Sequence, residues 1–276
     1  MINGSIKKMS TLEILTNIQN QLASLSISTD LIADEIFTII KFFLLMVLIL
    51  GILTLLHKLH LAEKVSSLSV NKKQKKREFK QNIICLLSQS IPMLFLFFLY
   101  KHGLTKLYFD PALYGYGYFI FTIVLLMFFL DACYYWIHRW FHATKIEFFQ
   151  KIHAVHHRSV NLNILSSFSM HPLEYYTFMF PPVICICIIP INITALVIFS
   201  IITQIFVFYG HNGYEAMPNG AIKNRIFSKF SNCVFHQMHH HYGKYNYGMY
   251  FTIWDRLMHT DHPDYEKTFN KIRTPH

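Results

Sequence analysis

The chain alternates long apolar segments with short polar ones, a pattern typical of helices that cross a membrane. The apolar runs occupy about residues 35–56, 82–100, 117–137, 173–189 and 191–210. Each run is close to the roughly 20 residues that a helix needs to span the hydrocarbon layer. Pro190 separates the last two runs, which are therefore expected to form a helical hairpin. The pattern predicts an all-α fold, a multi-pass bundle of about four to five membrane helices.

The region before the second run contains two further features. Residues 10–27 carry apolar side chains at helical spacing among polar ones, which predicts an amphipathic helix on the membrane surface. The run at 35–56 is too long for the apolar core of a signal peptide, and no small-residue cleavage site follows it. We therefore expect this run to remain as the first membrane helix.

Composition favours a membrane protein over a soluble domain. Hydrophobic residues make up 53% of the 276 positions and charged residues only 14%. The five cysteines are scattered, mostly within apolar runs, so they indicate neither a disulfide framework nor a zinc ribbon. We interpret them as small apolar residues.

Basic residues are distributed unevenly along the chain, which has a formal net charge of +10. The run KKQKKREFK at 72–80 follows a predicted membrane helix, where it indicates topology or contact with anionic lipid rather than nucleic acid. If the loop 58–81 is cytosolic, alternation of the helices also puts 138–171 and 211–276 in the cytosol. These three segments hold 20 of the 25 Lys and Arg residues, as the positive-inside bias requires.

Histidines gather in three clusters within these cytosolic segments. The clusters are His138 and His142, then His153, His156 and His157, and finally His236, His239 and His240. Their spacing puts the imidazoles of each cluster on one helix face. The same topology brings His171 and His211 to the cytosolic side. A lone histidine usually has a structural role, but three spaced clusters favour metal binding.

The first two clusters cannot lie on one straight helix and share a compact metal centre. Eleven residues separate His142 from His153, or about 16 Å along a helix. A break is therefore expected. Thr144 and Glu147 have the spacing of a capping box, which predicts a new helix beginning at Lys145.

Asp131 is an ionisable residue inside an apolar run, where it needs a partner. It falls on the same helix face as His138 and His142. Its carboxylate could accept the second N–H of a metal-binding imidazole, or it could bond a Tyr or Trp of a neighbouring helix. The sequence leaves both alternatives open.

The number of imidazoles restricts the chemistry of the site. Structural zinc takes four ligands, usually including thiolates, and haem takes one or two axial histidines within membrane helices. A transporter would place polar residues near the bilayer midplane, where these runs have almost none. Eight to ten nitrogen donors instead suit two metal ions with open positions for oxygen, and iron is the usual choice.

Several motifs together resemble one enzyme family. HRWFH, HAVHH and HQMHH are similar to the three histidine boxes of the fatty acid hydroxylase and sterol desaturase superfamily, membrane enzymes with two non-haem irons. The resemblance runs from about Asp131 to Thr260. It includes DACYYWIHR, the His171-Pro-Leu-Glu174 step, His211-Asn-Gly-Tyr, Asn246-Tyr-Gly and Trp254-Asp-Arg.

The resemblance implies a role for each of these residues. The eight clustered histidines would be catalytic metal ligands, with His171 and His211 completing the set and Asp131, Asn246 and Asp255 supporting it. His241 has no counterpart in the boxes and could compete with His240, whereas His259 and His262 are expected on the surface. Residues 117–276 would form the catalytic domain, preceded by an N-terminal segment with two membrane helices at 1–116.

The resemblance also implies an activity. The enzyme would use two iron ions and O2 to hydroxylate or desaturate an unactivated C–H of a lipid or sterol, and zinc could replace iron in isolated protein. Sterol desaturase and alkylglycerol monooxygenase activities are the alternatives, and a non-catalytic membrane metal-binding protein is an alternative of another class. The metal site would cap the cytosolic side of a helical bundle in a bacterial cytoplasmic or endoplasmic reticulum membrane.

Such chemistry needs electrons from outside the chain. No Gly-x-Gly-x-x-Gly turn and no cysteine cluster for an iron–sulfur centre occurs in the sequence. We expect an external donor, namely a b-type cytochrome, a ferredoxin or a reduced pterin system. A basic rim could steer an acidic donor or contact anionic lipid, and it consists of Lys223, Arg225, Lys229 and Lys244.

Overall fold

Helices make up most of the described chain in the computed structural model. The described residues are 44, 47–49, 51–52, 54–59, 61–66 and 69–274. The predicted surface helix at 10–27 and most of the predicted membrane helix at 35–56 lie outside them. Residues from Met46 onward form one unit, and the fold below is the fold of that unit.

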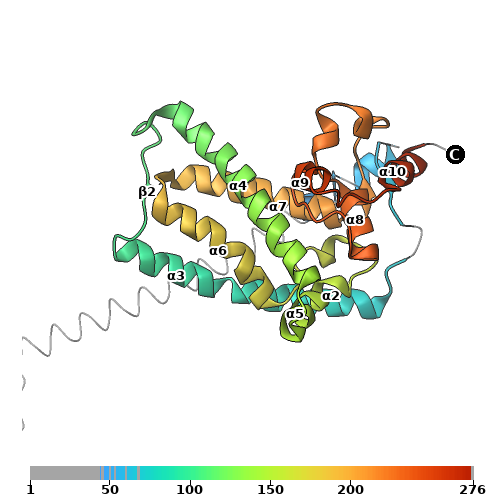
Figure 1. The fold of residues 1–276 in the computed structure, drawn as a ribbon, viewed down its shortest axis with the longest axis horizontal. Helices are drawn as coiled ribbons and strands as arrows, with labels where there is room; N and C mark the ends of the chain where they lie inside the picture. The colour runs from blue at the N-terminus through green and yellow to red at the C-terminus, as the bar shows by residue number, and fades with distance from the viewer. Residues whose placement is uncertain are drawn as a thin grey trace, which may run out of the picture. The chain divides into compact units, whose positions relative to one another are not determined.

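Nine helices, α2 to α10, lie wholly within the described residues (Figure 1), and the described residues between 44 and 58 are also helical. They are α2 (Lys72–Ser88), α3 (Ser90–Lys101), α4 (Gly115–Ala143), α5 (Glu147–His157), α6 (Pro172–Ile188), α7 (Ile193–His211), α8 (Cys233–Tyr242), α9 (Ile253–Leu257) and α10 (Tyr265–Arg273). Short 3-10 turns occur at Ile164–Ser166, Ala221–Lys223 and Phe227–Lys229.

The apolar runs of the sequence correspond to these helices. Three stretches of the described chain are long and apolar enough to cross a membrane: 72–101, which joins α2 and α3, then α4 and α7. Helix α6 is equally apolar but has only 17 residues. Four of the five predicted runs are thus helical in the described chain, and the prediction of an all-α membrane bundle is confirmed.

Helix α4 is the central helix, because both α6 and α7 pack against it. A buried apolar core joins these three helices to the segment near residue 250, and its members are Leu126, Leu130, Cys185, Ile186, Ile191, Phe199, Tyr250 and Phe251. A second core lies under α8 and α10, formed by Ala221, Val234, Phe235, Met238, Tyr265 and Phe269. The first core thus holds α4, α6 and α7 together, and the second holds α8 against α10.

Short strand pairs join the loops at the two ends of the bundle. Strand β2 (Leu107–Tyr108) pairs in parallel with β3 (Ile191–Asn192), so the loop after α3 meets the turn between α6 and α7. Strand β1 (Glu63–Lys64) pairs antiparallel with β4 (Tyr214–Glu215), just after the end of α7. The loops therefore alternate between two ends, as the sequence predicted.

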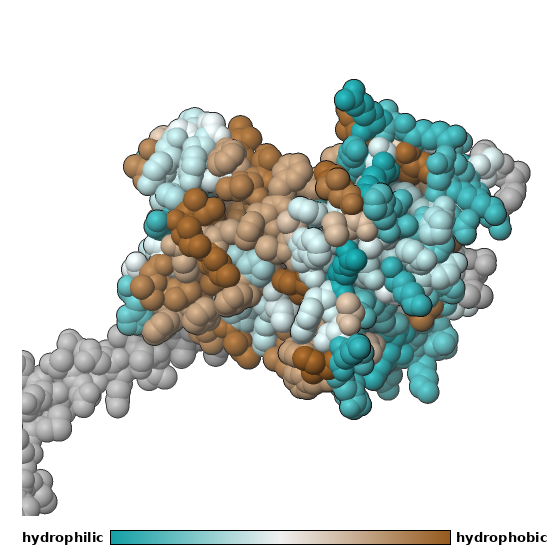
Figure 2. Space-filling view, viewed as in Figure 1, coloured by the Kyte–Doolittle hydropathy of each residue, from teal (hydrophilic) through white to brown (hydrophobic). Residues whose placement is uncertain are grey.

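The surface is also divided into an apolar part and a polar part, toward opposite ends of the bundle. In Figure 2, apolar residues cover the part of the face that holds α3 and α6, and polar residues cover the part with α8, α9 and α10. Phe95 and Phe98 on α3 are 48% and 51% exposed, and Ile120 on α4 is 60% exposed. Such apolar exposure fits lipid contact around the bundle, with a polar cap at one end.

The basic run at 72–80 differs from its prediction, because it forms the start of α2 and not a loop. Asn71 caps this helix by accepting a bond from the Gln74 backbone N–H. Side chains of α2 then bind the segment between α5 and α6: the Gln74 amide donates to the Asn161 carbonyl, and Asn82 donates to the Leu165 carbonyl. The start of α2 therefore braces the segment that follows the second histidine cluster.

Candidate metal centre

The predicted break between the first two histidine clusters is confirmed, but its details differ. Helix α4 ends at Ala143, and Thr144 has the extended backbone of a C-cap. Helix α5 begins at Glu147, with Ile146 as an N-cap that makes no side-chain bond. The prediction of a capping box and a helix from Lys145 was wrong, because the Thr144 hydroxyl accepts the Ile146 N–H within the turn.

Helix α8 carries the third cluster and is capped at both ends. The Asn232 side chain accepts the Phe235 backbone N–H at the start. Gly243 ends the helix in the left-handed conformation, with φ of 67°. His236, His239 and His240 are buried, whereas His241 is exposed and joins no metal-binding group of the described residues.

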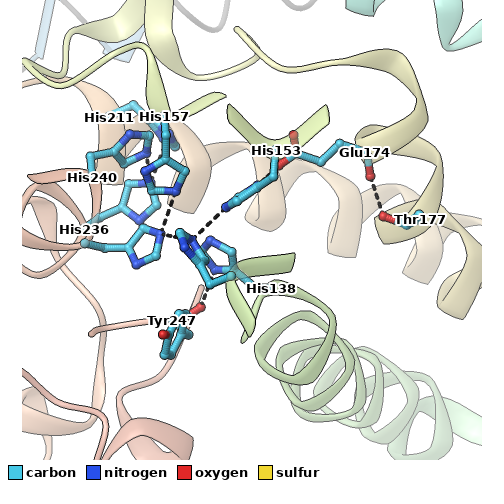
Figure 3. Close-up of polar contacts among 11 residues, drawn as sticks. His138, His153, His157, Glu174, Thr177, His211, His236, His240 and Tyr247 are labelled. Carbon is cyan, nitrogen blue, oxygen red and sulfur yellow. Dashed lines mark hydrogen bonds and ion pairs between the residues drawn. The ribbon is translucent and has the colours of Figure 1, made fainter. Parts of the chain in front are cut away.

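Nine imidazoles from α4, α5, α7 and α8 converge in two groups. Figure 3 shows several of them, including His138, His153 and His236, turned toward one another. We call them the first histidine set, His138, His142, His153, His157 and His239, and the second histidine set, His156, His211, His236 and His240. Within each set, one ligand atom per residue lies within 4.8 Å of all the others. Sequence neighbours divide between the sets, since His156 and His157 differ in set, as do His239 and His240.

The nitrogen separations match those of ligands around a metal ion. In the first set, the His142 Nε2 lies 2.8 Å from the His153 Nε2 and 3.2 Å from the His239 Nε2. In the second set, the His236 Nε2 lies 3.0 Å from the His211 Nε2 and 3.1 Å from the His240 Nε2. Metal–nitrogen bonds of about 2.1 Å at right angles separate neighbouring nitrogens by about 3 Å.

Contacts on the opposite ring nitrogens determine where the protons lie. The Nδ1 atoms of His138 and His239 donate to the carbonyls of Tyr247 and Tyr245, at 2.9 and 2.7 Å. The His153 Nδ1 lies 2.8 Å from the Glu174 carboxylate. Because a carbonyl oxygen can only accept, the Nδ1 atoms of His138 and His239 carry the proton, and their Nε2 atoms present lone pairs to the centre of the set.

These nitrogens suit a shared cation. The Nε2 atoms of His153 and His239 both face the His142 Nε2, and the His239 Nε2 also lies 3.0 Å from the His157 Nε2. The His138 Nε2 is buried without a hydrogen-bond partner in the described protein. One metal ion would satisfy all of these lone pairs together, so the donors fit an ion.

Burial keeps the imidazoles neutral, as metal binding requires. Burial lowers the pKa of His157 to about 4. Burial, and to a lesser degree the neighbouring imidazoles, lower the pKa well below the usual value for His153, His156, His236, His239 and His240. No proton therefore competes with a metal ion at neutral pH.

His171 departs from the predicted set of ten histidines. Its Nδ1 accepts the Leu173 backbone N–H at 3.1 Å, so this side chain caps α6. It belongs to neither histidine set. Glu174, one turn later, reaches the site instead, through His153. The sequence contained Glu174 in a motif, but gave no signal that it would contact an imidazole.

Asp131 satisfies neither of its two predicted alternatives. Its carboxylate accepts the backbone N–H groups of Tyr250 and Phe251, at 2.8 and 3.2 Å, and not an imidazole or an aromatic side chain. Asp255 acts in the same way, accepting the N–H groups of Tyr247 and Gly248 at 2.8 and 2.7 Å. Both carboxylates thus bind the loop of residues 245–251, which supplies carbonyls to His138 and His239.

Asn246 lies in the same loop, with an unusual positive φ of 60°. Its amide donates to the Phe235 carbonyl and its oxygen accepts the His262 N–H, at 3.0 and 2.8 Å. It therefore joins the loop to α8 and to the segment before α10. His262 is buried, which corrects the prediction of a surface position, whereas His259 is exposed as expected.

An apolar groove of ≈ 400 Å³ lies beside the first histidine set. Residues of α4, α5 and α6 line it: Phe141, Phe148, Phe149, Ile152, Leu173, Tyr176, Thr177 and Phe180. Phe141 stacks on the His153 imidazole, with ring centroids 5.3 Å apart. The groove could therefore hold a hydrocarbon group close to a ligand of the first set.

Comparisons with known proteins identify relatives of this chain. The family model described as fatty acid hydroxylase matches residues 123–260, which contain both histidine sets. The chain is 31% identical to lathosterol oxidase of Homo sapiens over 189 residues, 67% of this chain and 60% of that protein. It is 33% identical to Delta(7)-sterol 5(6)-desaturase of Leptosphaeria maculans over 188 residues, 67% of this chain and 50% of that protein. The match thus spans only half to three fifths of these relatives. No solved structure matches significantly.

Proposed function

Because the chain belongs to the fatty acid hydroxylase family, we propose that it is a membrane oxidoreductase that uses two iron ions and O2 to oxidise an unactivated C–H bond of a lipid or sterol. The observation that supports this most strongly is the pair of histidine sets, with the lone pairs of His138 and His239 turned inward in the first set. A single structural ion needs about four ligands, whereas sets of five and four donors suit two ions.

The chain's own residues hold and protect these ions. The first histidine set would bind one ion and the second histidine set the other, and zinc could replace iron in isolated protein. When bound, the irons would supply O2 activation and hydrogen removal from the substrate. His138 and His239 are fully buried, so the surrounding protein excludes water that would otherwise quench a reactive oxidant.

The substrate is proposed to come from the bilayer. The apolar groove beside the first histidine set has aromatic and aliphatic walls that suit a hydrocarbon group and no charged side chain. The relatives named above are called lathosterol oxidase and sterol desaturase, which makes a sterol the first substrate class to test. Hydroxylation, desaturation and alkylglycerol monooxygenase activity remain the alternative reactions on the same site.

The reaction requires an electron donor. Converting a C–H and O2 to C–OH and water consumes two electrons and two protons, and the described chain contains no flavin, haem or iron–sulfur motif to supply them. We propose that a b-type cytochrome, a ferredoxin or a reduced pterin system delivers the electrons. It would dock at the polar end of the bundle, and the distribution of positive charge supports a cytosolic location for that end.

The basic rim is a weaker docking site for the donor than the sequence suggested. All four cations are exposed, but Ile226 and Phe227 between Arg225 and Lys229 are 68% and 46% exposed. Apolar side chains among cations favour contact with anionic lipid. Reversal of the four charges to Glu should therefore alter activity mainly in anionic membranes. A higher apparent KM for the donor at low salt, in neutral membranes too, would favour donor docking.

Lipid mass spectrometry under ¹⁸O2 tests the proposal. Membranes from cells that express the chain should contain a lipid with one added ¹⁸O atom, or one that lacks two hydrogens. His240→Ala should abolish that product, and His241→Ala, which changes the exposed neighbour, should retain it. If the wild-type protein binds two irons and no lipid changes, the protein is instead a non-catalytic metal-binding protein.

A further inference from the structure

The two histidine sets differ in how the protein holds the far side of their imidazoles. In the first histidine set, the Nδ1 atoms of His138, His153 and His239 each have a protein acceptor within 2.9 Å. In the second set, the Nδ1 atoms of His156 and His240 are buried and have no hydrogen-bond partner in the described protein.

The hydrogen bond made by the His211 Nδ1 in the second set also restrains the site less. The His211 Nδ1 donates to the Val207 carbonyl at 2.8 Å, four residues earlier in the same helix. This contact orients the ring relative to α7 alone. In the first set, by contrast, the acceptors come from other elements, α6 and the loop of residues 245–251, so they fix α4, α5 and α8 relative to one another.

The acceptors of the first set are themselves held rigidly. Asp255 binds two consecutive N–H groups of the loop, and its other bond, at 2.8 Å, comes from the Thr260 hydroxyl. Asp131 binds two further N–H groups of the same loop. Hydrogen bonds to a carboxylate are stronger than those between neutral groups, so the loop that carries the Tyr245 and Tyr247 carbonyls has little freedom to move.

Glu174 adds a difference in the kind of partner, because it is a carboxyl group and not a backbone carbonyl. It is 1% exposed, and one carboxylate oxygen lies 2.8 Å from the His153 Nδ1 (Figure 3). A carboxylate partner raises the basicity of a metal-binding imidazole more than a carbonyl does, and it fixes the tautomer. Among the described residues, no acidic side chain contacts an imidazole of the second set.

We infer that the two metal positions are not equivalent: the first histidine set binds its ion tightly through Glu174 and the loop of residues 245–251, and the second set exchanges its ion faster. Glu174 acts on the ion through His153 and is thus a positioning residue. The inference rests on the proposed two-metal function. It predicts that a protein with one ion per chain holds that ion in the first set.

Release of Fe²⁺ to a coloured chelator tests the inference without any measurement of activity. The protein is loaded with Fe²⁺ in detergent without O2, and release is followed over time. Wild-type protein should release its two ions in two phases of equal amplitude whose rates differ by about 10-fold or more. His236→Ala should remove only the fast phase.

Glu174→Gln should accelerate the slow phase by about 10- to 100-fold and leave the fast phase unchanged. Thr177→Val is the matched control, because the Thr177 hydroxyl bonds only the Glu174 backbone carbonyl, at 2.7 Å. It should preserve both phases. A single phase that releases two ions from the wild-type protein would overturn the inference and leave the proposed function standing.

Two other results would also be decisive. Equal acceleration of both phases by Glu174→Gln would show a general structural role and overturn the assignment of Glu174 to the first set. Fewer than two ions bound to wild-type protein after loading would contradict the proposed function itself.

Discussion

Gly248→Ala is the substitution that most directly tests the role of the loop of residues 245–251. A Cβ atom at this position would clash with the Phe251 carbonyl oxygen and lie 2.9 Å from a carboxylate oxygen of Asp255. The closer atom belongs to the backbone, so the loop itself must move. That movement would displace the Tyr247 carbonyl oxygen from the His138 imidazole. This oxygen now accepts the hydrogen bond from the His138 Nδ1, at 2.9 Å.

The size of the effect follows from the contacts that are lost. Loss of an acceptor behind a metal-binding imidazole weakens metal binding about 10- to 100-fold, which equals about 1.4–2.8 kcal/mol. Displacement of the Gly248 N–H from Asp255 also removes a bond to a buried carboxylate, about 1.5–3 kcal/mol of folding stability. We expect both weaker binding in a competitive chelator titration and a lower unfolding temperature in detergent.

Gly117→Ala is the matched control, because no atom lies within 4 Å of the Cβ that it would add on α4. It should bind metal as the wild-type protein does. Wild-type metal affinity in Gly248→Ala would refute the claim that this loop orients the imidazoles. Equal losses in both variants would show that the assay reports general damage to the bundle.

Three further predictions concern stability and topology. Burial lowers the pKa of His157 from 6.5 to about 4, so below pH 6.5 the unfolded state of the metal-free protein binds a proton that the folded state does not. The metal-free protein should therefore be most stable above pH 6.5 and lose stability towards pH 4. A constant unfolding temperature across this range would contradict this prediction. Glu215→Gln should cost about 1–3 kcal/mol in a denaturant titration, because the buried Glu215 accepts the Val234 N–H at the start of α8. Cysteines at Lys76 and Tyr116 should react with a membrane-impermeant reagent from opposite sides, and labelling from one side would refute the topology.

The sequence was sufficient to predict the helices and the composition of most of the site. Apolar length predicted the membrane helices, and helical spacing predicted which histidines share a face. The distance along a helix between His142 and His153 required a break, which occurs at Thr144. These features depend on local periodicity, which a single sequence contains.

The remaining features depend on contacts between distant segments. The sequence correctly indicated that the Asp131 carboxylate needs a hydrogen-bond partner. Its partners, however, are the backbone N–H groups of Tyr250 and Phe251, about 120 residues away. Every residue has a backbone carbonyl, so the residue type at position 247 does not indicate that its carbonyl accepts a hydrogen bond from His138. His171 has a suitable side chain and topology, yet the start of α6 uses it as a cap.

A single-turnover experiment on purified protein tests the central claim most directly. Protein loaded with Fe²⁺ in sterol-containing vesicles is mixed with ¹⁸O2 in the absence of any electron donor, and the lipids are analysed by mass spectrometry. We expect about one oxidised lipid per chain and then no further product, because two Fe²⁺ ions supply only two electrons. Iron oxidation and O2 consumption without change in any lipid, including added alkylglycerols, would contradict the claim that this chain is a lipid oxidase.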